Sequence, residues 1–321
     1  MHYGFSIPNG GPLAGPEALR AIALKGEDLG FDCLVAPDHI IIPKSIDSAY
    51  PYSESGEFVS LSATSGECLE MHGVLSFLAA VTSRMRLITS VMVVPYRHPV
   101  LAAKLLATID VLSAGRLTVG CGAGWMEEEF APLGAPPFAE RGKATDEFIA
   151  AFKELWSSDT PTFEGAYTRF ANIAFAPKPV QRPHPPIWIG GESGPAMKRT
   201  VRLADGWYPI GNNPRFPMNT VGRFADGVQK LRGFAEEAGR DPAEIDLAFF
   251  APRYNESEAQ ILDDGARQAF TGSAEEIAAD IAGFRDSGLR HLVLNFLDPS
   301  LERTLERMAF FAETVRPLAG D

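Results

Sequence analysis

The stretch from Arg86 to Trp125 constrains the fold more than any other part of the sequence. It reads RLITSVMVV, a short turn, LAAKLLATIDVLSAG and then RLTVGCGAGW. The middle piece has apolar residues at helical spacing and ends at Gly115, where a left-handed glycine cap is favoured. Both flanking pieces are nearly continuous apolar runs, as strands covered on both faces must be. The stretch therefore predicts a strand–helix–strand unit in a parallel sheet.

The same alternation extends over the whole chain. Eight such units predict an α/β fold, a single (β/α)8 TIM barrel spanning residues 1–321. A doubly wound open sheet is the alternative, because periodicity alone does not close a barrel. The expected strands are 2–7, 32–36, 86–94, 117–121, 186–190, 206–210, 245–251 and 291–297, and the expected helices are 16–29, 68–83, 99–114, 140–157, 194–204, 217–239, 274–287 and 299–315.

Two segments exceed a minimal barrel. Residues 40–67 follow the second strand without a steady period, and the partly proline-rich residues 158–185 precede the fifth strand. Aromatic residues alternate in FEGAYTRF, which predicts a short extra strand or hairpin there. Insertions of this length are functional lids more often than idle loops, so we expect both to border the active site.

Charge and cysteine content narrow the class of protein. The 321 residues carry a formal net charge of −12, which argues against binding to nucleic acid or to an anionic membrane. The sequence shows neither the pattern of a signal peptide nor an apolar run long enough to span a bilayer. The three cysteines are scattered, and no motif has the spacing of metal ligands. We therefore expect a cytoplasmic protein without a metal site.

The candidate site residues follow from the barrel. In a parallel barrel the active site lies at the carboxyl ends of the strands. The candidates at these ends are Asn9, Asp38, His39, Ser90, Val91, Gly122, Ala123, Gly124, Trp125, Gly190, Gly191, Ser193 and Gly194.

Asp38 and His39 join the second strand to the first insertion. A carboxylate next to an imidazole can set its tautomer and its proton affinity, which suits acid–base catalysis. The structural alternative is a turn with a solvated histidine. For Arg97 and His98, at the start of the 99–114 helix, we expect structural roles, an ion pair and a helix cap.

Two glycine-rich segments are candidates for binding a cofactor. Residues 190–194 follow an apolar strand and open a helix, where free backbone N–H groups and the helix dipole favour a phosphate; an ordinary sharp turn is the alternative. In 120–124 the glycines alternate, which suits a flat ring lying against backbone, although a strand thinned for packing has the same pattern. Trp125 is expected either to stack on the ring or to cover the end of the barrel.

Taken together, these pieces resemble the bacterial luciferase-like superfamily of flavin and deazaflavin oxidoreductases, and most closely its coenzyme F420-dependent group. The motifs that carry the resemblance are GFSIPN, LGFDCLVAPDHI, the stretch around 83–125, PKPVQRPHPPIWIGG and RLADGWYPIG. The resemblance implies a (β/α)8 barrel, a ring over the strand ends and a homodimer.

The resemblance also assigns roles to single residues. It implies a non-prolyl cis peptide at Ser90–Val91 beside the ring, an Asp38–His39 pair next to the ring, and a cofactor phosphate at 190–194. Two positions depart from relatives: Trp125 replaces the catalytic glutamate of sugar-phosphate-oxidising members, and Ala123 replaces the arginine that luciferase uses for the FMN phosphate.

The resemblance thus predicts an F420-dependent oxidoreductase that transfers hydride to or from a small organic substrate. His39 would donate or accept the proton while Asp38 holds it. One alternative is an FMN-dependent monooxygenase that uses dioxygen, and another is a barrel that binds a flavin without turnover.

Overall fold

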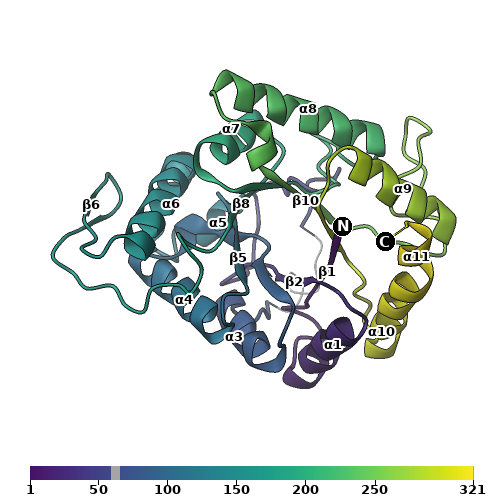
Figure 1. The fold of residues 1–321 in the computed structure, drawn as a ribbon, viewed down its shortest axis with the longest axis horizontal. Helices are drawn as coiled ribbons and strands as arrows, with labels where there is room; N and C mark the ends of the chain where they lie inside the picture. The colour runs from purple at the N-terminus through teal and green to yellow at the C-terminus, as the bar shows by residue number, and fades with distance from the viewer. Residues whose placement is uncertain (59–65, 321) are drawn as a thin grey trace.

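The chain folds into a closed barrel of parallel strands with helices around it (Figure 1). The structure is a computed structural model that describes residues 1–58 and 66–320. Each strand pairs in parallel with the next around the ring, and the pairing of β3 with β5 closes it. The predicted TIM barrel is confirmed and the open sheet is wrong. The barrel strands are β1 (His2–Ser6), β2 (Cys33–Ala36), β3 (Arg86–Thr89), β4 (Met92–Val93), β5 (Leu117–Gly122), β8 (Ile187–Gly190), β9 (Gly206–Tyr208), β10 (Asp246–Ala251) and β11 (His291–Leu294).

The outer helices agree with the sequence pattern to within a few residues at their ends. Ser273 and Glu276 form the capping box that begins one of them, and His98 and Ser193 each accept a backbone N–H at the start of another. The α-helices are α1 (Pro16–Asp28), α3 (Met71–Val81), α4 (Pro99–Leu112), α5 (Glu127–Phe130), α6 (Arg141–Ser157), α7 (Gly194–Leu203), α8 (Val221–Glu237), α9 (Ala274–Asp286), α10 (Leu301–Phe310) and α11 (Arg316–Leu318), with a π-helical turn at Phe311–Val315.

The third barrel strand is interrupted at the mouth. β3 ends at Thr89, the peptide bond between Ser90 and Val91 is cis, and β4 resumes at Met92. The Thr89 hydroxyl donates to the Gly120 carbonyl, and the Ser90 N–H donates to the Ala36 carbonyl. The predicted cis bond is confirmed. The two hydrogen bonds tie the interruption to the strands on both sides.

The second insertion lies on the outside of the barrel. Its hairpin of β6 (Phe163–Glu164) and β7 (Arg169–Phe170) confirms the extra strands, and Figure 1 shows it projecting beyond α6. The Glu147 carboxylate of α6 accepts the N–H groups of residues 166–168. Further along, Gln181 bonds to Asp110 and to the Leu117 carbonyl at the amino end of β5. The expectation that residues 158–185 border the active site is therefore wrong.

The interior of the barrel is filled by side chains. A separate buried cluster on the strands includes Cys33, Val35, Ile88, Trp188 and Val293. Burial raises the pKa of the Cys33 thiol to about 12, so this cysteine packs as a small apolar group. Ligands must therefore bind above this layer. Among the described residues, no helix is long and apolar enough to cross a membrane, and no cluster of His, Cys, Asp and Glu could hold a metal ion.

Candidate functional site

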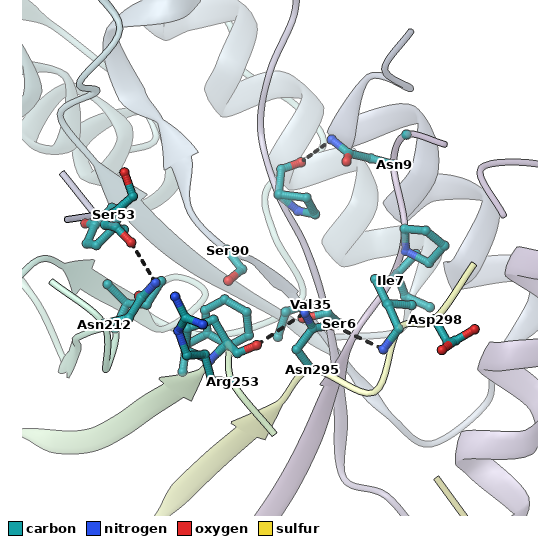
Figure 2. Close-up of a pocket in the computed structure, with 18 of the residues that line it drawn as sticks. Ser6, Ile7, Asn9, Val35, Ser53, Ser90, Asn212, Arg253, Asn295 and Asp298 are labelled. Carbon is teal, nitrogen blue, oxygen red and sulfur yellow. Dashed lines mark hydrogen bonds between the residues drawn. The ribbon is translucent and has the colours of Figure 1, made fainter. Parts of the chain in front are cut away.

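A cavity of about 710 Å³ opens above the barrel core at the carboxyl ends of the strands. Figure 2 shows its lining, with Ser90 near the centre and Asn212, Arg253 and Asn295 around it. Apolar surface comes from Ile7, Val35, Ile210 and Phe250. The cavity has the size and the mixture of apolar walls and few polar groups that small-molecule sites have.

Ser90 forms the polar centre of the cavity floor. Its hydroxyl lies 3.0 Å from the hydroxyl of Tyr208 on β9. Tyr208 is buried, and burial raises the pKa of its hydroxyl well above the usual value. Because the phenol stays protonated, it can donate to Ser90 and leave the serine proton directed elsewhere.

Asparagine amides form the polar rim. Asn9 donates to the Pro37 carbonyl at 3.5 Å, and Asn295 donates to the Pro252 carbonyl at 3.5 Å. Asn212 donates to the Tyr52 carbonyl at 2.8 Å, which joins the first insertion to the end of β9. Tyr50, Tyr52 and Ser53 line the cavity, so the described part of the first insertion borders it as predicted; residues 59–65 lie outside the described residues.

Asp38 is held by an arginine. Each of its carboxylate oxygens lies 2.8 Å from a terminal nitrogen of Arg97, and one oxygen also accepts the Val93 N–H at 2.9 Å. Both side chains are buried, so this bidentate ion pair is shielded from water. The guanidinium also bonds to Glu70 at 2.7 Å. Arg97 thus forms the expected ion pair, and it does so with two carboxylates, the buried Asp38 and the exposed Glu70.

His39 is held by Glu129 and not by Asp38. The Nδ1 atom of His39 lies 2.8 Å from the Glu129 carboxylate, whose side chain is fully buried. Tyr96 donates to the same carboxylate oxygen at 2.7 Å, and the other oxygen accepts the N–H of Ile40. The expectation that Asp38 orients the imidazole is therefore wrong. The Glu129 carboxylate does so, and Nε2 has no hydrogen-bond partner among residues 1–58 and 66–320.

The alternating glycines of β5 make room for Val91. A Cβ atom on Gly122 would lie 2.7 Å from a Val91 methyl, and one on Gly120 would lie 2.1 Å from the Thr89 carbonyl oxygen. A Cβ on Gly124, whose φ is +86°, would meet Val93 at 2.8 Å. The space beside these glycines is therefore filled by the interrupted third strand. The packing interpretation of this segment is correct, and the expected glycine wall for a flat ring is not formed.

Trp125 lies under the first insertion. Its ring centroid is 4.9 Å from that of Tyr50, 5.2 Å from that of Phe58 and 6.5 Å from that of His39. Burial raises the pKa of Tyr50 to about 12. This aromatic cluster separates His39 and Trp125 from the cavity, so neither of them lines it, nor do Ala123 and Gly124.

The loop between β8 and α7 contains a left-handed glycine, a serine cap and a buried acid. Gly191 has a φ of +103°, which only glycine adopts readily, and Ser193 accepts the Ala196 N–H. Glu192 accepts the Ile210 N–H and the Asn213 amide, both at 2.8 Å. Burial raises the pKa of Glu192 to about 7. The carboxyl can therefore be neutral near physiological pH, when it would not repel a phosphate.

The family of the chain is decided by sequence comparison. The sequence profile described as luciferase-like monooxygenase matches residues 1–270. The chain belongs to this family.

Individual relatives of this luciferase-like protein differ in what is known of them. An FMNH2-dependent dimethylsulfone monooxygenase of Pseudomonas putida is 39% identical over 138 residues, which cover 42% of this chain and only 38% of the relative. The uncharacterized protein Rv0953c of Mycobacterium tuberculosis is 30% identical over 288 residues, covering 88% of this chain and 96% of that protein.

Solved structures of similar fold include a monooxygenase and an F420-dependent reductase. The monooxygenase RslO1 of Streptomyces bottropensis superposes with a TM-score of 0.75 at 22% identity, covering 99% of both chains. The coenzyme F420-dependent tetrahydromethanopterin reductase of Methanopyrus kandleri gives 0.73 at 18% identity, covering 98% of both chains. At these identities the likeness shows the shared barrel alone.

The cavity of this luciferase-like protein brings together only part of the predicted site. Asn9 and Ser90 line it, whereas Asp38, Val91 and the 190–194 loop lie outside its lining. Sequence reasoning missed Asn295 and Arg253, although both follow strand ends and the same rule could have found them. It also missed Glu129 and Tyr96, for which the sequence holds no local signal.

Proposed function

We propose that this luciferase-like oxidoreductase binds coenzyme F420 over the strand ends and acts on a small organic substrate in the cavity above Ser90. The observation that carries the proposal is this cavity of about 710 Å³ at the carboxyl ends of the strands, with Ser90 at its floor. Bound F420 would supply a hydride acceptor or donor at the central position of its ring.

The lining fits such a group in chemistry as well as in size. Ile7, Val35 and Phe250 offer apolar faces, whereas Ser90 and Asn295 offer hydrogen bonds to polar ring edges. The 190–194 loop would hold the cofactor phosphate through the Gly194 N–H and the helix dipole at the start of α7, because Pro195 has no N–H and the Ala196 and Met197 N–H groups bond to Ser193. Ala123 argues against FMN as the preferred cofactor, because it provides no guanidinium for a second phosphate contact.

His39 is proposed as the group that moves the proton. Glu129 fixes its Nδ1 side, so Nε2 is the atom that would donate or accept. In the present arrangement Phe58 lies against the imidazole, with ring centroids 5.3 Å apart. The mechanism therefore requires the aromatic part of the first insertion to withdraw from His39 when ligands bind.

An FMN-dependent monooxygenase that uses dioxygen is the second candidate, since one of the relatives bears that kind of name. A barrel that binds a flavin without turnover is a third. We also propose a homodimer, as the resemblance implies, and a cytoplasmic location, which suits three cysteines that are all free.

Titration of the apoprotein with F420 and with FMN, followed by absorbance, tests the proposal. We expect F420 to bind clearly more tightly than FMN. Equal or tighter binding of FMN would overturn the cofactor assignment and favour the monooxygenase.

A further inference from the structure

A second cavity, of about 520 Å³, lies on the outer face of the barrel between α6, α7 and α8. It begins at Gly194 and Pro195, where the 190–194 loop becomes α7. Figure 1 shows α7 and α8 side by side at this edge of the molecule. This outer groove is therefore continuous with the loop proposed to hold a phosphate, but it faces away from the barrel interior.

The outer groove is strongly cationic. Lys198, Arg199 and Arg202 of α7 and Lys230 of α8 line it, against the single carboxylate of Asp146. The whole chain has a formal net charge of −12. Like charges gathered in a concavity repel one another, and such a surface concentrates anions from solution. The local excess of positive charge in an acidic protein therefore points to an anionic ligand.

The two arginines are already positioned, and the two lysines are available. The Asp146 carboxylate bonds to Arg199 and, at 2.6 Å, to Arg202. Arg199 also donates to the Gly142 carbonyl at 2.9 Å. Lys198 lies with its ammonium 4.9 Å from the ring centroid of Phe234. Among the described residues, neither lysine ammonium has a hydrogen-bond or ion-pair partner, so both can bind an anion without breaking a hydrogen bond or an ion pair.

The length of the groove indicates the shape of the ligand. From Gly194 to Arg202 the helix rises by about 12 Å. One phosphate is much shorter than this distance and would reach only part of the charge. A chain with several carboxylates or phosphates would match both the length and the charge.

We propose that the outer groove binds a flexible polyanion, a chain bearing several carboxylates or phosphates, that runs from the 190–194 loop along α7. The proposal deepens the proposed function and rests on it for one of two sources of the ligand. F420 carries a chain of carboxylates beyond its phosphate, whereas FMN ends at its phosphate. The other source is a separate polyanion that binds without the cofactor.

Calorimetric titrations distinguish these sources. The probes are F420 with its oligoglutamate tail, the tail-less deazaflavin chromophore, free γ-linked tetraglutamate and tripolyphosphate. Lys198→Glu and Lys230→Glu are compared with Lys25→Glu on α1, which makes the same charge change on the other side of the barrel. Lys198 and Lys230 are exposed, so their variants should fold as the parent does.

We expect each charge reversal in the outer groove to weaken binding of the polyanion by roughly tenfold, because it removes an attraction and adds a repulsion. The loss should shrink at high salt, and Lys25→Glu should have no effect. A loss for F420 but not for the tail-less chromophore assigns the groove to the cofactor tail. A loss for the free probes only assigns it to a separate polyanion. If F420 fails to bind but the free probes bind and respond to the charge reversals, the proposed function is refuted and the proposal of a polyanion site in the outer groove is supported. If no probe responds to the reversals, the groove proposal is wrong.

Discussion

Gly122 should tolerate alanine only when Val91 is shortened. The new Cβ would lie 2.7 Å from a Val91 methyl carbon, about 1 Å inside a normal carbon–carbon contact. Overpacking of this kind costs about 1–3 kcal/mol. In a Val91→Ala background the nearest remaining atom is the residue 91 Cβ at 3.8 Å, an ordinary contact. The same substitution should then cost nothing, or stabilise slightly because alanine restricts the unfolded chain.

Chemical denaturation of the two single variants and the double variant measures this coupling. We expect an interaction free energy of about 1–2 kcal/mol in favour of the double variant. Gly124→Ala is the matched control, because its Cβ would meet Val93 and Phe130 and its φ is positive, so Val91→Ala should not rescue it. If Gly122→Ala instead leaves stability unchanged and weakens cofactor binding in both backgrounds, the glycines form a ring wall and the packing argument is refuted.

Three further outcomes are expected. Asp38→Asn removes a charge that neutralises the buried Arg97 and should lower the free energy of unfolding, measured in urea, by about 3 kcal/mol. An unchanged unfolding midpoint would show that Glu70 alone is enough to neutralise Arg97. Burial raises the pKa of Glu192 from 4.5 to about 7 in the folded state, so its contribution to stability is complete below about pH 4.5 and is lost as the pH rises through 7. Between pH 4.5 and 7.5 the free energy of unfolding of Glu192→Gln should therefore gain about 3 kcal/mol relative to that of the parent. A difference that does not change with pH would contradict the raised pKa. His39→Ala should reduce turnover on a verified substrate by about 10²–10⁴-fold with F420 affinity nearly intact, and full activity would show that His39 is only part of a turn.

The barrel was predictable because its signals are local. Apolar runs, helical spacing and glycine stops are read within ten or so residues, and they located the strands and helices well. The partners of the site residues are not local. His39 bonds to a carboxylate 90 residues away, and nothing in the run of three glutamates at 127–129 shows which one turns inward. The glycines of β5 have the same pattern whether a ring or Val91 fills the space beside them. Only the three-dimensional structure shows that Val91 occupies this space.

The packing of Trp125 makes the first insertion optically observable. The chain has four tryptophans, and the other three, Trp156, Trp188 and Trp207, are at most 2% exposed. Trp125 alone is half-buried, and two of its aromatic neighbours, Tyr50 and Phe58, belong to the insertion. A soluble quencher such as iodide will therefore reach Trp125 selectively. The quenched fraction of the intrinsic fluorescence becomes a direct gauge of whether the insertion is closed on the barrel, with no label and no knowledge of the substrate.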